Sequence, residues 1–122
     1  MIYGIGIDTV KITRVEKAIR RQHFLESVFT PAEQEEIAIR KSRCASDFAG
    51  KEAVVKMFGT GFGKIGASDI SILREESGRP YVVLHGRAKE LAEQERIDKI
   101  HISITNTDDL ASAFVIGERV EG

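Results

Sequence analysis

The stretch Phe48–Gly61, FAGKEAVVKMFGTG, decides the fold more than any other part of the chain. It predicts one helix that ends at Gly59 and passes into a glycine-rich turn. Helical spacing puts Glu52 and Lys56 on one face, and Lys51 lies about 100° away from Glu52 around the axis. These three side chains can therefore line one side of a cleft. One carboxylate that can bind a hard cation, flanked by two ammonium groups that can bind phosphate oxygens, is what a metal-bound pyrophosphate requires.

A second carboxylate, Asp8, stands near the N-terminus. Residues 1–10 alternate with a period of two, which predicts a strand. Its two faces carry different residues, namely Tyr3, Ile5 and Ile7 against Gly4, Gly6 and Asp8. The glycines let another backbone approach their face, and Asp8 projects from it at the end of the strand. Because Mg²⁺ usually takes one or two carboxylates, Asp8 and Glu52 would form a magnesium site if the fold brings them together.

The remaining chain alternates between helical and strand patterns. We expect helices at residues 13–23, 31–41, 45–59 and 86–96. We expect further strands at residues 70–75, 81–85, 99–105 and 110–116. Thr13 would open the first helix in a capping box with Glu16. The segment Thr30–Glu33 is a stronger start signal, because it joins a cap, a proline and an acid. This order of elements predicts an α+β fold.

Length and composition limit the possible functions. The 122 residues suffice for one domain, spanning 1–122, with one modest core. The net charge of −1 gives no overall attraction to nucleic acid or to a membrane. No stretch approaches the roughly 18 apolar residues that span a bilayer, and the N-terminus lacks a signal pattern. The single cysteine, Cys44, excludes an internal disulfide and fits a reducing compartment, so we expect a cytoplasmic protein.

Basic residues recur on one face of the first expected helix, namely Arg14, Lys17 and Arg21. A stripe of this kind is most often an ordinary solvated surface. On a chain with almost no net charge, however, a local basic patch can also dock a specific acidic partner. The residues alone leave both interpretations open.

Each of the other signals also has an ordinary structural explanation. Glu52 and Lys56 could form a surface pair worth about 0.3 kcal/mol, and Asp8 could cap the turn after its strand. The turn Gly59–Gly61 could be only a helix C-cap, and it does not fit a Walker loop, whose glycines open a helix. The functional interpretation is that these small residues let a nucleotide lie close to the backbone.

Five stretches carry a resemblance that reaches from the first residues to about Val115: Gly4–Asp8 with Arg14, Phe29–Glu33, Phe48–Gly61, Gly78–Pro80 and Ser103–Asp109. With them, the chain resembles the 4'-phosphopantetheinyl transferases, in particular their short single-domain form, the holo-acyl-carrier-protein synthases. The Lys-Glu-Ala-x-x-Lys spacing is common on helices, but it becomes fairly specific when joined to the N-terminal Gly-x-Asp and this chain length. The resemblance implies helices packed on a small antiparallel sheet, and a homotrimer whose active sites lie between subunits.

The resemblance also implies an activity. It is the Mg²⁺-dependent transfer of 4'-phosphopantetheine from coenzyme A to a serine hydroxyl of apo acyl carrier protein in fatty acid biosynthesis, releasing adenosine 3',5'-bisphosphate. Asp8 and Glu52 would bind Mg²⁺, and Lys56, helped by Lys51, would offset charge on the leaving phosphate. Further coenzyme A contacts would come from Gly59, Thr60, Gly61, Arg79, Pro80, Thr105 and Asn106. The acidic carrier protein would dock on Arg14, Lys17 and Arg21.

Two positions depart from the family pattern. Asn106 stands where the family commonly has histidine, and Asp47 stands where it tends to have arginine. Both family residues resemble contacts to the 3'-phosphate of coenzyme A. We therefore expect a weaker contact, unless Lys51, Lys64 or Arg79 replaces them. The departures also leave a second possibility, a non-catalytic module of the same fold that binds coenzyme A or a carrier protein.

Overall fold

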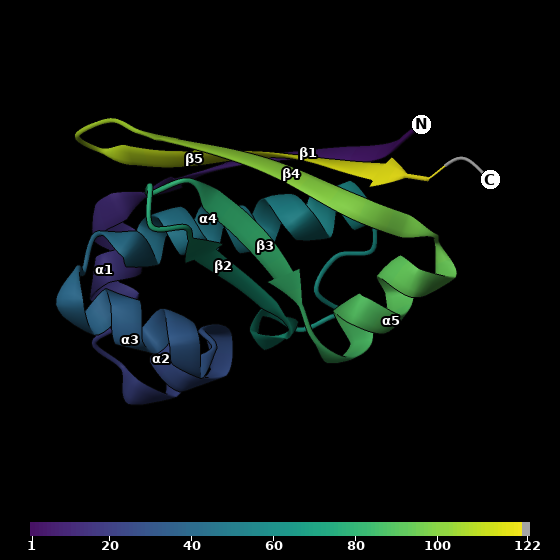
Figure 1. The fold of residues 1–122 in the computed structure, drawn as a ribbon. Helices are drawn as coiled ribbons and strands as arrows, with labels where there is room; N and C mark the ends of the chain where they lie inside the picture. The colour runs from purple at the N-terminus through teal and green to yellow at the C-terminus, as the bar shows by residue number, and fades with distance from the viewer. Residues whose placement is uncertain (121–122) are drawn as a thin grey trace.

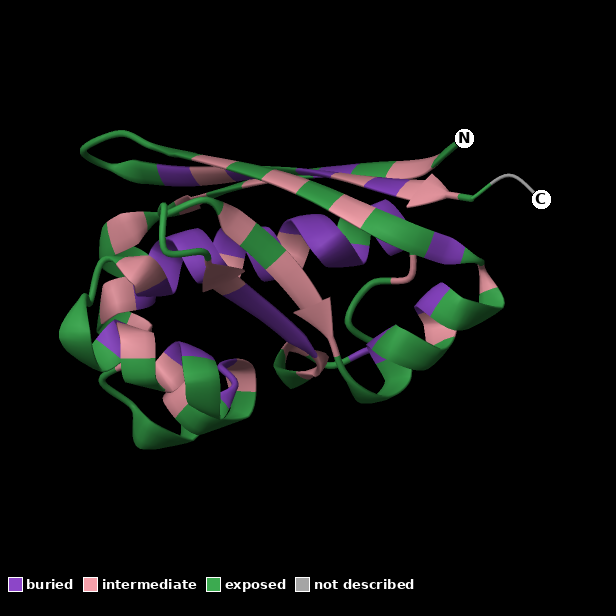
Figure 2. Ribbon diagram, in the orientation of Figure 1, coloured by how far each residue is buried: buried purple, intermediate pink, exposed green. Residues whose placement is uncertain are grey.

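The helix predicted from the opening stretch lies at the centre of the fold. The computed structural model describes residues 1–120, and in it α4 (Arg43–Phe58) runs beneath a sheet of three long strands (Figure 1). The helix ends at Gly59, whose φ of 77° is the left-handed conformation that favours glycine, as predicted. Most of its side chains are buried, and Figure 2 shows buried segments along its length. α4 therefore forms much of the core.

The sheet above α4 is antiparallel throughout. Its strands are β1 (Ile2–Lys11), β5 (Leu110–Arg119) and β4 (Ile97–Asn106), in the order β1-β5-β4. The predicted N-terminal strand and C-terminal hairpin are both confirmed, and the hairpin strands are slightly longer than expected. Because β5 pairs with both neighbours, β1 and β4 form the two edges of this sheet.

Two glycines allow β1 to approach α4 closely. Gly4 and Gly6 face the helix, and an added methyl group would overlap the carbonyl oxygens of Met57 and Ala53, respectively. Ile5 and Ile7, on the opposite face of β1, are more than half exposed. The predicted alternation is therefore confirmed. Asp8 is on the glycine face and therefore contacts Lys56 of α4.

A short hairpin packs on another side of α4. It consists of β2 (Ile70–Arg74) and β3 (Pro80–Leu84), and the short helix η1 (Ala67–Asp69) precedes it. Ile72 of β2 and Ile102 of β4 both lie against Gly50 of α4, where a larger residue would crowd them. Helix α5 (Gly86–Gln94) then leads back to the edge strand β4.

Three short helices cover the amino-terminal half of α4, namely α1 (Ile12–Ala18), α2 (Gln22–Val28) and α3 (Pro31–Ile39). The capping box predicted for α3 is present: the Glu33 N–H donates to the Thr30 hydroxyl at 3.4 Å, and the Thr30 N–H donates to the Glu33 carboxylate at 2.9 Å. The architecture is α+β with helices packed on small antiparallel sheets, as predicted. Within residues 1–120, no helix is long and apolar enough to cross a membrane.

The helix predicted at residues 13–23 begins and ends elsewhere. Lys11, not Thr13, is its N-cap, and no side chain caps it. The cause is that β1 runs directly into α1, so that the Ile12 N–H donates across the sheet to the Asp109 carbonyl oxygen at 2.9 Å. The chain also leaves the helix after α1 and starts again as α2, where one continuous helix was expected.

Candidate active site

Asp8, near the N-terminus, and Lys56, near the middle of the sequence, meet at the β1 edge of the sheet. The Lys56 ammonium donates to the Asp8 carboxylate at 2.9 Å and to the Ile7 carbonyl oxygen at 3.2 Å. The Asp8 side chain is 14% exposed, whereas that of Lys56 is 54% exposed. The ammonium group therefore covers one side of the carboxylate and still faces solvent, where an anionic substrate can reach it.

Glu52 lies one helical turn before Lys56 and is half-buried beside Asp8. Burial raises the pKa of Glu52, and the negative charge of Asp8 raises it further, whereas Lys56 opposes the shift. The surface pair that the spacing allowed between Glu52 and Lys56 is absent among residues 1–120, since Lys56 pairs with Asp8 instead. The two carboxylates thus repel one another, and a cation between them would relieve that repulsion.

The donor set at this edge fits Mg²⁺. Asp8 Oδ2 is buried and has no hydrogen-bond partner in the described part of the chain. An unpartnered carboxylate oxygen is costly to bury, and a cation would satisfy it. Residues 1–120 contain no group of three or more His, Cys, Asp or Glu side chains that could hold a metal. Two carboxylates are nevertheless sufficient for Mg²⁺, which usually keeps several waters and binds substrate phosphates.

The glycine-rich turn leaves α4 at the end that carries Lys56. Gly59 and Gly61 both have positive φ values, and no atom of residues 1–120 would obstruct a side chain at either position. Open space beside the turn is consistent with both interpretations of it, because a C-cap can also line a binding surface. Thr60 lies between the two glycines, and its hydroxyl donates to the Gly61 carbonyl oxygen at 3.2 Å.

The prediction that Lys51 lines this cleft is wrong. Its side chain is fully buried, and its ammonium lies 2.6 Å from the Glu33 carboxylate. The ammonium also donates to the carbonyl oxygens of Ala67 and Ile70. Burial lowers the pKa of Lys51, and the Glu33 charge opposes that shift. The angular spacing on α4 was right, but α3 and β2 cover the face that carries Lys51 and supply its partners.

A second group of predicted residues surrounds a hollow of about 350 Å³ near Asn106. Pro80 and Asn106 line it together with three arginines, Arg40, Arg43 and Arg74, and we call it the arginine hollow. Ser42 and Ser46 also line it, which places it at the amino end of α4. The Asn106 amide donates to the Ser46 hydroxyl at 2.9 Å. Three guanidinium groups at a helix amino end favour an anion.

Sequence reasoning missed Arg40, Arg43 and Arg74. The basic run Arg40-Lys41-Ser42-Arg43, immediately before the central helix, was the signal that could have indicated the first two. Of the other predicted contacts, Arg79 and Thr105 are exposed and do not line the arginine hollow. Arg79 lies in the turn before β3, and Thr105 lies near the end of β4.

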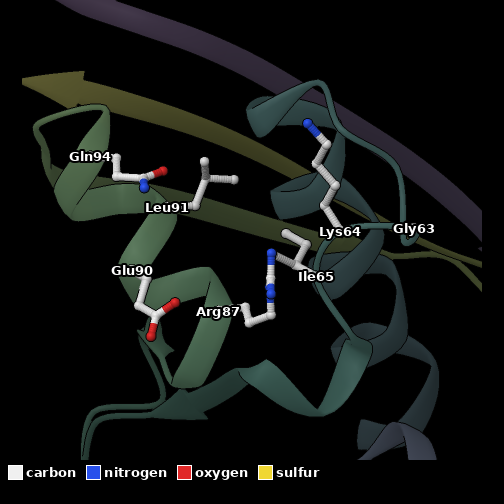
Figure 3. Close-up of a pocket in the computed structure, with 7 residues that line it drawn as sticks. All are labelled: Gly63, Lys64, Ile65, Arg87, Glu90, Leu91 and Gln94. Carbon is white, nitrogen blue, oxygen red and sulfur yellow. The ribbon is translucent and has the colours of Figure 1, made fainter.

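Lys64, another suggested replacement for the missing cations, lies elsewhere. It lines a hollow of about 460 Å³ between the loop after α4 and helix α5, which Figure 3 shows with Arg87 and Glu90 on the α5 side. Apart from Lys64, none of the residues that line this hollow was predicted to contact coenzyme A. Lys64 is therefore not one of the cations that surround Asn106.

The predicted site residues thus form two groups on opposite edges of one sheet. Asp8 lies on the β1 edge with Glu52 and Lys56, whereas Asn106 lies on the β4 edge with Pro80. Strand β5 separates the two edges.

The basic stripe forms a surface of its own on α1 and the turn that follows it. Arg14, Lys17 and Arg21 line a shallow hollow of about 540 Å³ together with Ala18 and Arg20. Among residues 1–120, no acidic side chain lines this hollow, and four of its five lining residues are basic. The predicted stripe residues are therefore brought together, with Arg20 as an additional member.

Comparison with known proteins finds holo-[acyl-carrier-protein] synthases both by sequence and by structure. The family model described as the 4'-phosphopantetheinyl transferase superfamily matches residues 4–115. A holo-[acyl-carrier-protein] synthase from Lachnoclostridium phytofermentans is 51% identical, over 97% of this chain and 97% of its own length. One from Halothermothrix orenii is 41% identical, over 97% of this chain and 98% of its own length.

Solved structures give the same result. A holo-(acyl-carrier-protein) synthase from Bacillus anthracis, in complex with CoA (3',5'-ADP), has a TM-score of 0.82 and 30% identity, covering 98% of this chain and 99% of that chain. The Helicobacter pylori holo-[acyl-carrier-protein] synthase in complex with coenzyme A has a TM-score of 0.83 and 32% identity, covering 93% of this chain and 99% of that chain.

Proposed function

The chain belongs to the 4'-phosphopantetheinyl transferase superfamily, and we infer that it catalyses the transfer of 4'-phosphopantetheine from coenzyme A to apo acyl carrier protein. Coenzyme A is the substrate, and adenosine 3',5'-bisphosphate is the other product. The observation that carries this conclusion is the convergence of Asp8 with Glu52 and Lys56, in which one carboxylate oxygen is buried without a partner among residues 1–120.

Asp8 and Glu52 would hold Mg²⁺, which when bound would neutralise the pyrophosphate oxygens of coenzyme A. Lys56 projects into solvent from the same edge, so its ammonium can contact a phosphate oxygen and offset the charge that develops on the leaving group. The open turn at Gly59, Thr60 and Gly61 leaves room for the substrate beside Lys56. Attack by the serine hydroxyl in line with the leaving group needs no covalent intermediate on the protein.

The other end of coenzyme A would occupy the arginine hollow. Coenzyme A carries a 3'-phosphate apart from its pyrophosphate, so the site needs a second group of cations. Pro80 and Asn106 line this hollow with the three arginines, while Thr105 and Arg79 lie on the surrounding surface. Arg40 and Arg43, of which Arg43 also pairs with Glu36 at 3.5 Å, would supply the positive charge that Asp47 and Asn106 do not.

A transfer assay distinguishes this activity from the alternative, a non-catalytic binding module. The protein is mixed with coenzyme A, Mg²⁺ and an apo acyl carrier protein, and mass spectrometry follows the carrier. We expect the carrier to gain the mass of one phosphopantetheine group. Binding of coenzyme A with no mass gain at high protein concentration would favour the module and contradict the proposed activity.

A cytoplasmic location stays a prediction.

We also propose a homotrimer with active sites between subunits. The two groups of site residues lie on opposite edges of the sheet, so a second copy would bring its arginine hollow to the Asp8 edge of the first. An apolar patch on the outer face of the sheet supports contact between copies. Ile7 and Phe114 are paired neighbours there and are 59% and 38% exposed, with Ile5 beside them.

The trimer predicts that Ile7→Glu separates the subunits, because a carboxylate would be buried in the contact. Light scattering should give the wild type a mass three times that of the 13.5 kDa chain, and the variant a smaller mass with little transfer activity. Ile39→Glu is the matched control, since Ile39 is 90% exposed on α3, away from this face. A wild type that is monomeric and fully active would show that the site is complete within one chain.

Carrier docking on α1 is the third proposal. Arg14, Lys17 and Arg21 form a positive surface, and carrier proteins are acidic. Replacing Arg14 and Arg21 together by Glu should raise the KM for the carrier about tenfold, because charge attraction speeds encounter. The KM for coenzyme A should not change. Lys89→Glu on α5 is the control. If the carrier KM of the double variant equals that of the wild type, the stripe is an ordinary solvated surface.

A further inference from the structure

Asp47 is shielded from solvent and is not among the residues that line the arginine hollow, although the family tends to have arginine at this position. Its side chain is completely buried, and its Oδ1 accepts a hydrogen bond from Arg74 Nη1 at 2.9 Å. Its Oδ2 is buried and has no partner within the described residues. Burial raises the pKa of Asp47 to about 7, whereas the Arg74 charge favours the ionised form. Asp47 can therefore affect a ligand only through Arg74, the side chain that it binds.

Arg74 lies between two hollows. It ends β2, its side chain is only 9% exposed, and it lines both the arginine hollow and a larger hollow of about 670 Å³ with Leu73 and Tyr81. Within the described residues its side chain makes two hydrogen bonds, to Asp47 and to the Ile72 carbonyl oxygen at 3.3 Å, and both use Nη1. A guanidinium has five N–H donors in a rigid plane. Fixing Nη1 therefore fixes the direction of the remaining donors.

We propose that Asp47 is a positioning residue that holds the guanidinium of Arg74 at the wall of the arginine hollow, where Arg74 helps to bind the 3'-phosphate of coenzyme A. This inference rests on the proposed function, because coenzyme A is the ligand that brings the 3'-phosphate. It reverses the expectation of a weakened contact. Besides Arg40 and Arg43, one cation that contacts the phosphate comes from β2, and position 47 supplies its anchor.

The surroundings of Asp47 support an anchoring role. Glu33 from α3 and Lys51 from α4 are the other charged groups that act on Asp47, and they are paired with one another at 2.6 Å. Arg74 is therefore the partner that remains for the Asp47 carboxylate. An arginine held by a buried carboxylate loses little further side-chain freedom when it binds an anion, which strengthens the contact.

The test compares coenzyme A with 3'-dephospho-coenzyme A, which lacks the phosphate in question. The main variant combines Asp47→Asn with Arg74→Gln, so that no unpaired charge stays buried. Its KM for coenzyme A should rise about tenfold, the loss expected for a hydrogen bond to a charged group. Its KM for 3'-dephospho-coenzyme A and its kcat with either substrate should stay within about twofold of the wild type. Asp47→Asn alone should give a smaller increase that is likewise confined to coenzyme A.

Arg87→Gln on α5 is the control for loss of an arginine elsewhere, and thermal unfolding of each variant checks that it is folded. Equal increases in KM for coenzyme A and for 3'-dephospho-coenzyme A would show that Asp47 and Arg74 only support the fold. This result would overturn the inference. An unchanged KM for coenzyme A would overturn it as well. A wild type that transfers from neither substrate would instead refute the proposed function, so the two failures are distinguishable.

Discussion

Asp8→Asn and Glu52→Gln should each lower the rate of phosphopantetheine transfer by about a hundredfold to a thousandfold. The amides keep the size of the side chains but remove the charge that a hard cation needs. In Asp8→Asn, the bond from Lys56 to Oδ1 can persist, because an amide oxygen also accepts a hydrogen bond. The variant therefore separates the loss of charge from the loss of local structure. Transfer to the carrier at saturating Mg²⁺ and coenzyme A is the measurement.

Two matched substitutions control for the loss of a carboxylate. Asp98 on β4 and Glu90 on α5 are exposed and lie outside the proposed site. Asp98→Asn and Glu90→Gln should retain wild-type rates. Near-normal transfer by Asp8→Asn or Glu52→Gln would contradict the roles that we assign to these carboxylates.

Lys51→Met should lower the free energy of unfolding by about 3–5 kcal/mol. The substitution removes the cation from a fully buried pair and leaves the Glu33 carboxylate in the core. That carboxylate keeps backbone donors from Thr30 and Ile72, at 2.9 and 2.8 Å, but loses its counter-charge. Chemical denaturation monitored by circular dichroism provides the measurement.

The double variant Lys51→Met, Glu33→Gln is the control for this prediction. Removing both charges should recover at least about 1 kcal/mol relative to the sum of the single effects, because the residues interact directly. If Lys51→Met instead keeps wild-type stability and raises the KM for coenzyme A, Lys51 binds substrate and its pairing with Glu33 does not stabilise the fold.

Local signals predicted the centre of the fold well. The helix that ends at Gly59 and the glycine face of β1 follow from backbone requirements, since only glycine fits where β1 approaches the Ala53 carbonyl oxygen. Asp8, Glu52 and Lys56 also stood out within their own elements, although the pairing of Asp8 with Lys56 was not predicted. In these cases, one or two neighbouring residues determine the geometry.

Features that depend on distant segments could not be predicted in this way. Lys51 lies on a face of α4 that α3 and β2 cover, and helical spacing does not reveal that cover. The cap at Thr13 failed because β1 continues into α1. Asp47 suggested that the chain had lost a cation at this position, because its partner, Arg74, is 27 residues away on another element. The division of the site between two sheet edges likewise depends on strand order.

Mn²⁺ can serve as a spectroscopic probe of whether Asp8 and Glu52 together hold one divalent cation. Electron paramagnetic resonance measures free Mn²⁺ during a titration of the protein in the presence of coenzyme A. We expect one bound ion per chain in the wild type, and greatly weakened binding in the double variant Asp8→Asn, Glu52→Gln. Equal binding by both proteins would contradict the account.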